Sequence, residues 1–157
     1  MKYNVKVVAP EVLIPPLITL LDEAESVPLL ISGSSMTPFL VHGRDTVYLS
    51  KPKRPLRRGD MVLYQRRNGA YVLHRIHRVC NGSYTMVGDA QTQLEPGICQ
   101  EQVLALVTAV KRKGTLLEPT SFRWRFFEKI WIRMVPLRPA AMALYSRLKK
   151  SINLWSK

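Results

Sequence analysis

Apolar residues follow three different patterns along this chain, and each pattern predicts a different kind of structure. Between residues 10 and 25 they recur at helical spacing, at Val12, Leu13, Leu17, Leu20 and Leu21. Pro15 and Pro16 interrupt this pattern. Because proline is accepted at the start of a helix but not within it, we expect the main helix to begin at about residue 15.

From Val27 onward, short β-like runs alternate with turn residues. The runs cover residues 28–32, 46–50, 60–66, 70–80, 83–88 and 102–112. Asn68-Gly69 and Asn81-Gly82 separate successive runs, and this dipeptide is the strongest short signal for a β-hairpin. Regularly spaced short strands predict a mainly β fold, as a curled antiparallel sheet or partial barrel.

The pattern changes again after Gly114. Residues 121–135 mix large aromatic side chains with Arg and Lys, and residues 140–155 form a second amphipathic pattern. We therefore divide the chain into a short helical lead-in (1–26), a β-domain (27–114) and a basic, aromatic, amphipathic helical tail (115–157). A length of 157 residues fits one domain with an appendage and excludes an eight-fold β/α barrel, which needs about 250 residues.

Positive charge is concentrated in the tail. The formal net charge of the chain is +13, of which residues 1–110 carry +3 and residues 120–157 carry +8, with Glu128 as the only acid of that last segment. As one helix, residues 121–135 place positions 127, 130, 131 and 134 on a single face beside the cationic positions, which is typical of an interfacial helix. We expect residues 120–157 to contact an anionic membrane surface. The alternative is packing of this apolar face on the β-domain, and nucleic acid is disfavoured because no recognised reader motif accompanies the charge.

Neither a cofactor nor a membrane span is expected. The apolar stretches are shorter than the roughly 20 residues of a span, and no export signal precedes the domain. We therefore expect a peripheral, membrane-associated protein on the cytoplasmic side. Two cysteines make no disulfide framework. His74, His77 and Cys80 are spaced three apart, which suits a zinc site on a helix rather than on the strand expected here.

Three short segments contain residues suited to nucleophilic catalysis. Ser35 lies in a Gly-containing turn, where a serine is open to substrate and its own N–H can face an oxyanion. His74 and His77 point to opposite faces of a strand, so only one of them can serve a given site. Asp89 follows Gly88 after the next strand, where an acid can orient a histidine. Alone, each segment is more often an ordinary loop, a structural histidine or a turn.

Together these segments resemble a known family. Gly33-x-Ser35-Met36-x-Pro38, Arg58-Gly59-Asp60-Met61-Val62, Tyr71-Val72-Leu73-His74-Arg75-Ile76 and Gly88-Asp89 occur in the order found in type I signal peptidases and the related self-cleaving repressor proteases. The resemblance covers roughly residues 27–110. It implies that Ser35 is the nucleophile and that His74 is the general base, as in the endoplasmic-reticulum type. It further implies Asp89 as the orienting acid and Ser34, Ser35 and Met36 as oxyanion or substrate-binding positions. Glu95 is a candidate for the further acid that this type carries past its Gly-Asp box.

The function expected from this resemblance is a serine endopeptidase that cleaves a leader, signal-type or membrane-proximal peptide. Histidine suits the base position because its usual pKa near 6.5 is closer to neutrality than that of lysine, near 10.4. Two alternatives stay open. The chain cleaves itself, as the repressor relatives do, or it is a non-catalytic peptide-binding module on the same fold.

Overall fold

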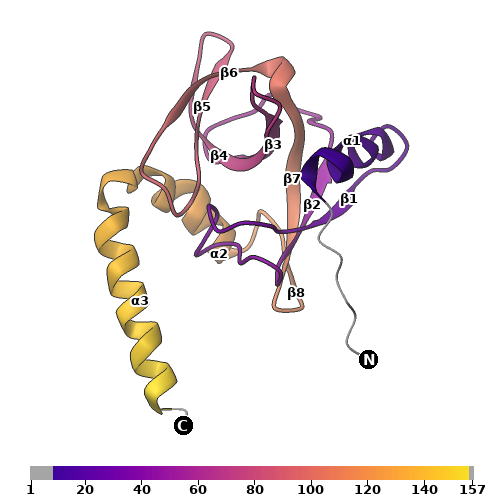
Figure 1. Cartoon of the computed structure of the whole chain (residues 1–157). Coiled ribbons are helices and arrows are strands. Elements are labelled where there is room, and N and C mark those ends of the chain that lie inside the picture. Colours follow the sequence, from indigo (N-terminus) through magenta and orange to yellow (C-terminus); the bar gives the residue numbers. More distant parts are fainter. Residues whose placement is uncertain (1–8, 156–157) are drawn as a thin grey trace, which may run out of the picture.

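The strands of this protein form one curled antiparallel sheet (Figure 1). The computed structural model describes residues 9–155, and for residues 148–155 it describes the backbone only. The strands are β1 (Val27–Leu30), β2 (Thr46–Ser50), β3 (Met61–Gln65), β4 (Tyr71–Cys80), β5 (Ser83–Val87), β6 (Glu95–Cys99), β7 (Val103–Arg112) and β8 (Thr115–Leu117). Their order across the sheet is β1-β2-β7-β3-β4-β5-β6, with β8 paired to β7. The sheet stays open instead of closing into a barrel, and the predicted mainly β fold is confirmed.

All six predicted strands are present, and the Asn-Gly dipeptides form the expected turns. Asn81 and Gly82 both have positive φ, +47° and +75°, as a two-residue hairpin turn requires, and they bring Cys80 opposite Ser83. Two strands were not predicted. β6 begins Glu-Pro-Gly, which reads as a turn, yet proline and glycine are tolerated there because β6 is an edge strand. β8 is only three residues long.

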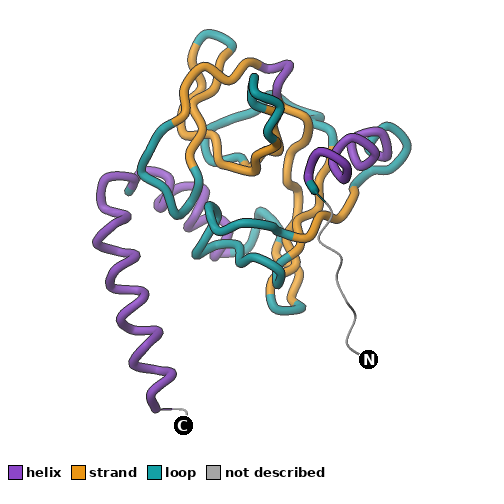
Figure 2. The backbone as a smooth tube through the Cα atoms, viewed as in Figure 1, coloured by secondary structure: helices purple, strands orange, loops and turns teal. Residues whose placement is uncertain are grey.

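The sheet curls far enough for distant segments to meet. β1 and β6 are the two ends of the strand order, yet the loop that follows β1 contacts the loop between β5 and β6. The contact is direct, because Ala90 N–H donates to the Ser35 carbonyl oxygen at 2.8 Å. Figure 2 shows both loops in teal between the orange strands. The curl therefore brings the serine loop to the end of the sheet that carries β4 and β5.

The N-terminal helix begins earlier than predicted. α1 spans Pro10–Leu20 and contains Pro15 and Pro16. These prolines leave the carbonyls of Glu11 and Val12 without helical N–H partners, but both residues are exposed, so water can satisfy the carbonyls. The helix is held by its inner face, where Ile14 and Leu17 are buried against the sheet. The expectation of a start near residue 15 is wrong because packing of this face outweighs the two lost hydrogen bonds.

The tail folds differently from the single helix predicted for residues 121–135. Residues 122–137 form α2 (Phe122–Arg125), a π-helical turn η2 (Phe126–Ile130), and two 3₁₀ turns, η3 (Trp131–Arg133) and η4 (Val135–Leu137). A further 3₁₀ turn, η1 (Gln100–Gln102), precedes β7. The π turn adds a residue to the helical repeat, so the buried positions become Trp124, Trp131, Ile132 and Val135. The predicted common face of positions 127, 130, 131 and 134 is therefore wrong, because Ile130 is half exposed.

Residues 122–138 are part of the folded body, whereas the last helix is not enclosed by it. The Trp124 ring packs edge-on against Phe39 at 5.9 Å, within the largest buried cluster. α3 (Arg138–Trp155) matches the helix predicted for residues 140–155 and runs away from η4 in yellow in Figure 1. No helix in the described part of the chain is long and apolar enough to cross a membrane.

Candidate active site

The serine loop connects β1 to β2 and is anchored at both sides of Ser35. Gly33 has φ +88°, a left-handed conformation that favours glycine, and its N–H donates to His42 Nδ1 at 3.0 Å. Met36 is buried in the core, so its side chain fixes the loop rather than facing solvent. Ser34 is exposed and Ser35 is half-buried. Within the described residues, the Ser35 hydroxyl and the Ser35 N–H make no hydrogen bond to another residue.

His74 lies in the middle of β4, opposite Val62 on β3, and only 3% of its surface is exposed. Its Nδ1 lies 3.3 Å from the hydroxyl oxygen of Tyr64, the diagonal neighbour on β3. That hydroxyl donates its only proton to Glu95 Oε2 at 2.7 Å. The Tyr64 oxygen must therefore accept from His74 Nδ1–H, and this assigns the neutral tautomer in which Nε2 carries the free lone pair.

The Glu95 carboxylate is itself held in place. Arg66 donates to both of its oxygens, each at 2.7 Å, which is the bidentate geometry that guanidinium and carboxylate favour. These bonds to Arg66 lower the pKa of Glu95, so it stays ionised as the acceptor of the Tyr64 hydroxyl. Burial lowers the pKa of His74 to about 4, and it raises the pKa of Tyr64. At neutral pH the chain from Arg66 to His74 is thus a cation, a carboxylate, a neutral phenol and a neutral imidazole.

Gly88 is the point where the serine loop and the histidine meet. A Cβ placed on Gly88 would lie 2.6 Å from the Ser35 carbonyl oxygen and 3.0 Å from His74 Nε2. It would also lie 2.9 Å from Gln91 Oε1. Atoms this close leave no room for any side chain at position 88. The glycine therefore leaves a small space that is bordered by both the Ser35 carbonyl oxygen and the Nε2 of His74.

Asp89 is placed with Arg75 rather than with His74. Its carboxylate is fully buried and accepts from Arg75 Nε, with oxygen distances of 3.0 and 3.1 Å. Because residues 74 and 75 alternate across β4, the Asp89–Arg75 pair and His74 lie on opposite faces of the strand. The group on His74 Nδ1 is the Tyr64 hydroxyl, so the predicted contact between Asp89 and His74 is not found among the described residues.

The C-terminal segment holds the Gly-Asp turn from outside. Trp131 Nε1–H donates to the Asp89 carbonyl at 2.8 Å. The buried guanidinium of Arg138 donates to the carbonyls of Gly88 and Gln91, each at 2.7 Å, and to that of Trp131 at 3.2 Å. The basic tail therefore supplies two side chains that position the candidate site, a role that its composition did not indicate.

The second histidine of β4 and Cys80 lie away from this cluster. His77 is half-buried at a register shift of β4 against β5, and Cys80 is exposed at the end of β4. In the described part of the chain, no three side chains of the metal-ligating types His, Cys, Asp and Glu are grouped to hold an ion. A pocket of about 440 Å³ opens beside the Arg66–Glu95 pair. It is lined by Arg66, Arg67, Asn68, Glu95, Pro96, Gly97, Ile98 and Gln102.

Sequence reasoning missed Tyr64 and Arg66, and it named Glu95 only as a candidate for a further acid. A signal existed for Tyr64, because strand alternation places it on the same face of β3 as Val62, the partner of His74. Comparison with protein-family models, with curated proteins and with solved structures finds no match to this chain. The resemblance to signal peptidases therefore rests on the four sequence segments alone.

Proposed function

We propose that this chain is a serine endopeptidase in which Ser35 is the nucleophile and His74 is the general base. The observation that carries the proposal is the meeting of Ser35 and His74 Nε2 around Gly88. Ser35 lies in the loop between β1 and β2 and His74 lies within β4, far apart in sequence, and a purely structural glycine turn needs neither of them. A serine backbone and the free lone pair of a buried imidazole that border the same small space bring together the two residue types that nucleophilic catalysis requires.

The reaction follows the usual course of acyl transfer. His74 Nε2 accepts the Ser35 proton as Oγ attacks the scissile carbonyl, and the same proton then passes to the leaving amine. Water repeats the sequence on the acyl-enzyme. The Ser35 N–H, which has no acceptor among the described residues, donates to the oxyanion, and the proposal gives the exposed Ser34 a supporting role there. The Ser35–His74 hydrogen bond forms when substrate covers the loop, as catalytic hydrogen bonds often tighten in the complex.

In this proposal Tyr64 and Glu95 orient the base, in the place that the sequence assigned to Asp89. The Tyr64 oxygen accepts from Nδ1 and fixes the tautomer, while Glu95 fixes the Tyr64 proton. When His74 becomes cationic in the transition state, the nearby Glu95 carboxylate stabilises it. Asp89 positions the turn through its buried pair with Arg75.

The proposed substrate is an extended leader, signal-type or membrane-proximal peptide that adds to a sheet edge. β1 is an edge strand, and it leads directly into the serine loop. A peptide paired with its open side would pass towards Ser35. The family resemblance adds a preference for small residues near the scissile bond.

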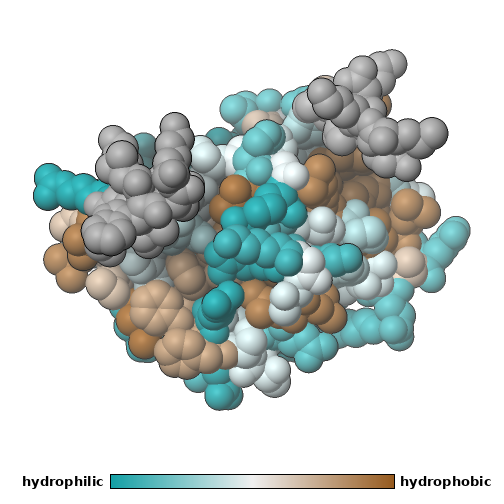
Figure 3. Space-filling view, turned by 90° about the horizontal axis from the view of Figure 1, so that it is seen from below, coloured by the Kyte–Doolittle hydropathy of each residue, from teal (hydrophilic) through white to brown (hydrophobic). Residues whose placement is uncertain are grey.

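Contact with an anionic membrane surface is proposed for α3 rather than for the whole of residues 120–157. The large aromatic side chains of Trp124 and Trp131 are buried. In contrast, Leu137 just before α3 and Leu144 and Tyr145 within α3 are exposed. Figure 3 views the molecule from below and shows apolar and hydrophilic residues side by side on this lower surface. We also propose that the protein lies on the cytoplasmic side of the membrane. Flotation of the full chain and of Leu144→Gln/Tyr145→Gln with anionic vesicles tests the membrane contact, and equal recovery of both proteins would rule out α3.

Cleavage of synthetic peptides by the purified full chain tests the catalytic proposal. Ser35→Ala should abolish turnover, and His74→Ala should lower it about 10²–10⁴-fold, the range for loss of a general base. His77→Ala is the matched control, since it removes the other histidine of β4 from outside the site. Undiminished cleavage by Ser35→Ala would contradict the proposal. Release of a fragment of the chain itself, dependent on Ser35, would identify self-cleavage instead.

A further inference from the structure

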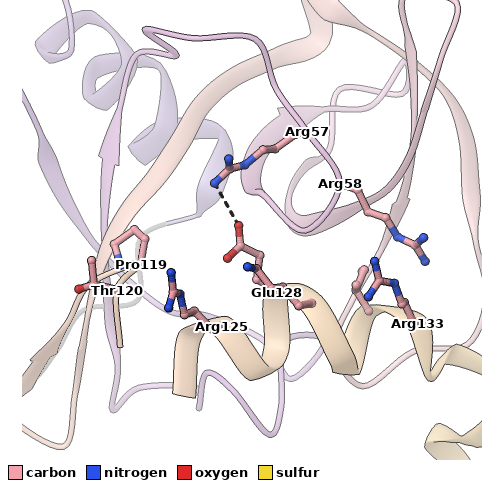
Figure 4. Close-up of a pocket in the computed structure, with 9 residues that line it drawn as sticks. Arg57, Arg58, Pro119, Thr120, Arg125, Glu128 and Arg133 are labelled. Carbon is pink, nitrogen blue, oxygen red and sulfur yellow. Dashed lines mark hydrogen bonds and ion pairs between the residues drawn. The ribbon is translucent and has the colours of Figure 1, made fainter. Parts of the chain in front are cut away.

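A second pocket, about 490 Å³ in volume, lies where the turn before β3 meets the C-terminal segment (Figure 4). It is lined by Arg57, Arg58, Pro119, Thr120, Arg125, Glu128, Lys129, Ile132 and Arg133. We propose that this pocket binds a phosphate group carried by a small molecule or a lipid. The inference concerns a different surface from the Ser35–His74 cluster and does not depend on the proposed peptidase activity.

The two walls of the pocket are fixed against each other by their backbones. Gly59 has φ +93°, and a Cβ at this position would lie 2.6 Å from both Cγ and the carbonyl oxygen of Glu128. On the inner side, buried Arg75 donates to the Gly59 carbonyl at 2.9 Å. The backbones that carry the cationic side chains of the turn and of α2, η2 and η3 are therefore fixed relative to each other before a ligand binds.

The pocket carries an unbalanced charge. Five cationic side chains line it against the single carboxylate of Glu128, which leaves a formal charge of +4. Arg57 uses that carboxylate, at 3.4 Å, as Figure 4 shows by a dashed line. The nearby Asp60 binds Arg54 and also lies 3.9 Å from Arg57 Nε, so Arg57 has a carboxylate on each side. The remaining four cations, Arg58, Arg125, Lys129 and Arg133, form no ion pair within the described part of the chain.

Such a cluster matches phosphate better than other anions. Several arginines present planar, forked donors that bind phosphate oxygens in pairs, and a phosphate group offers more acceptors and more charge than one carboxylate. The volume lies within the range of small-molecule sites, about 300–1,000 Å³, yet charged side chains dominate the lining. A nucleic acid would instead need basic residues along an extended track, and these five converge on one concave site.

Calorimetric titration of the full chain with inorganic pyrophosphate at low salt tests the inference. We expect saturable binding at one site, weakened at least tenfold in Arg125→Gln/Arg133→Gln. The matched control is Arg78→Gln/Arg123→Gln, which removes the same charge from exposed arginines outside the pocket and should bind as the wild-type chain does. Glu128→Gln removes the opposing carboxylate and should tighten binding several-fold.

Vesicles of phosphatidylcholine, with and without phosphatidic acid, distinguish the two sources of phosphate. If pyrophosphate displaces the chain from phosphatidic acid vesicles, the phosphate is that of a lipid headgroup. If pyrophosphate binds while the vesicles do not, the ligand is a soluble phosphate compound. No saturable binding, or equal weakening in both double variants, would overturn the inference. Tighter binding of single-stranded DNA that both double variants weaken equally would also overturn it, because it would show a diffuse charge effect.

Discussion

Acidification should destabilise this protein through His74. Its imidazole is 3% exposed, and burial lowers its pKa to about 4, against the ordinary value of 6.5 expected in the unfolded chain. Between these two values the unfolded chain holds a proton that the folded chain lacks, so the free energy of unfolding rises with pH across this window. The destabilising contribution of His74 is therefore absent above about pH 6.5, and it grows as the pH falls towards 4.

The size of this effect follows from the two pKa values. Each pKa unit corresponds to about 1.36 kcal/mol, so the wild-type chain should lose about 3 kcal/mol near pH 4 through this one group. That is a large share of the roughly 5–15 kcal/mol by which domains are stable. His74→Asn should lack this component and show a correspondingly flatter pH dependence.

Urea unfolding followed by tryptophan fluorescence, at several pH values between about 7 and 4, measures the difference. His42→Asn is the control for pH dependence, because it removes an exposed imidazole and keeps the buried one. Since it also removes the acceptor of the Gly33 N–H, the slopes against pH are compared and not the absolute stabilities. If the wild-type chain and His74→Asn lose stability in parallel as the pH falls, His74 is not held neutral in the fold. The assignment of its Nε2 lone pair would then fail as well.

Three further substitutions test the contacts around the candidate site. Gly88→Ala forces a methyl group against the Ser35 carbonyl and His74 Nε2. It should cost about 1–3 kcal/mol of stability in urea unfolding and lower the cleavage rate about 10²-fold. Wild-type stability and wild-type cleavage in this variant would refute the close packing around Gly88. Tyr64→Phe removes the group that orients the imidazole, so it should lower kcat more than it raises KM, and unchanged kinetics would exclude the orienting role. Arg138→Met removes a donor from three carbonyls, of which those of Gly88 and Trp131 keep the N–H of Gln91 and Met134. It should therefore cost about 1–3 kcal/mol in urea unfolding, and an unchanged free energy of unfolding would show that the tail does not hold the turn.

Local patterns in the sequence predicted most of the sheet and the last helix, but not β6, β8 or the turns of residues 122–137. β4 and β5 could be placed because alternation and the Asn81-Gly82 turn act over neighbouring residues. β6 could not, since Glu95-Pro96-Gly97 becomes a strand only because β5 offers it an edge. The π turn of η2 depends on the fit of the C-terminal segment to the β-domain, which no helical periodicity encodes.

Some residues of the candidate site could likewise be predicted from local patterns, and others could not. Ser35 and His74 could be singled out because their chemistry is visible in short motifs. The partner of His74 could not, because the diagonal contact of Tyr64 depends on the register of β3 against β4. Asp89 shows the limit of a motif most clearly. Its place next to Gly88 is as expected, but its carboxylate faces the side of β4 that carries Arg75.

Labelling with a serine-directed covalent probe, read out by intact mass and peptide mapping, tests the central proposal most directly because it needs no knowledge of the substrate. The account predicts one label on Ser35 of the wild-type chain, absent from Ser35→Ala, strongly reduced in His74→Ala and retained in His77→Ala. A label that persists in Ser35→Ala would contradict it. So would the absence of any label between about pH 5 and 9, where His74 is neutral and free to act as a base, and this result would favour the non-catalytic peptide-binding alternative.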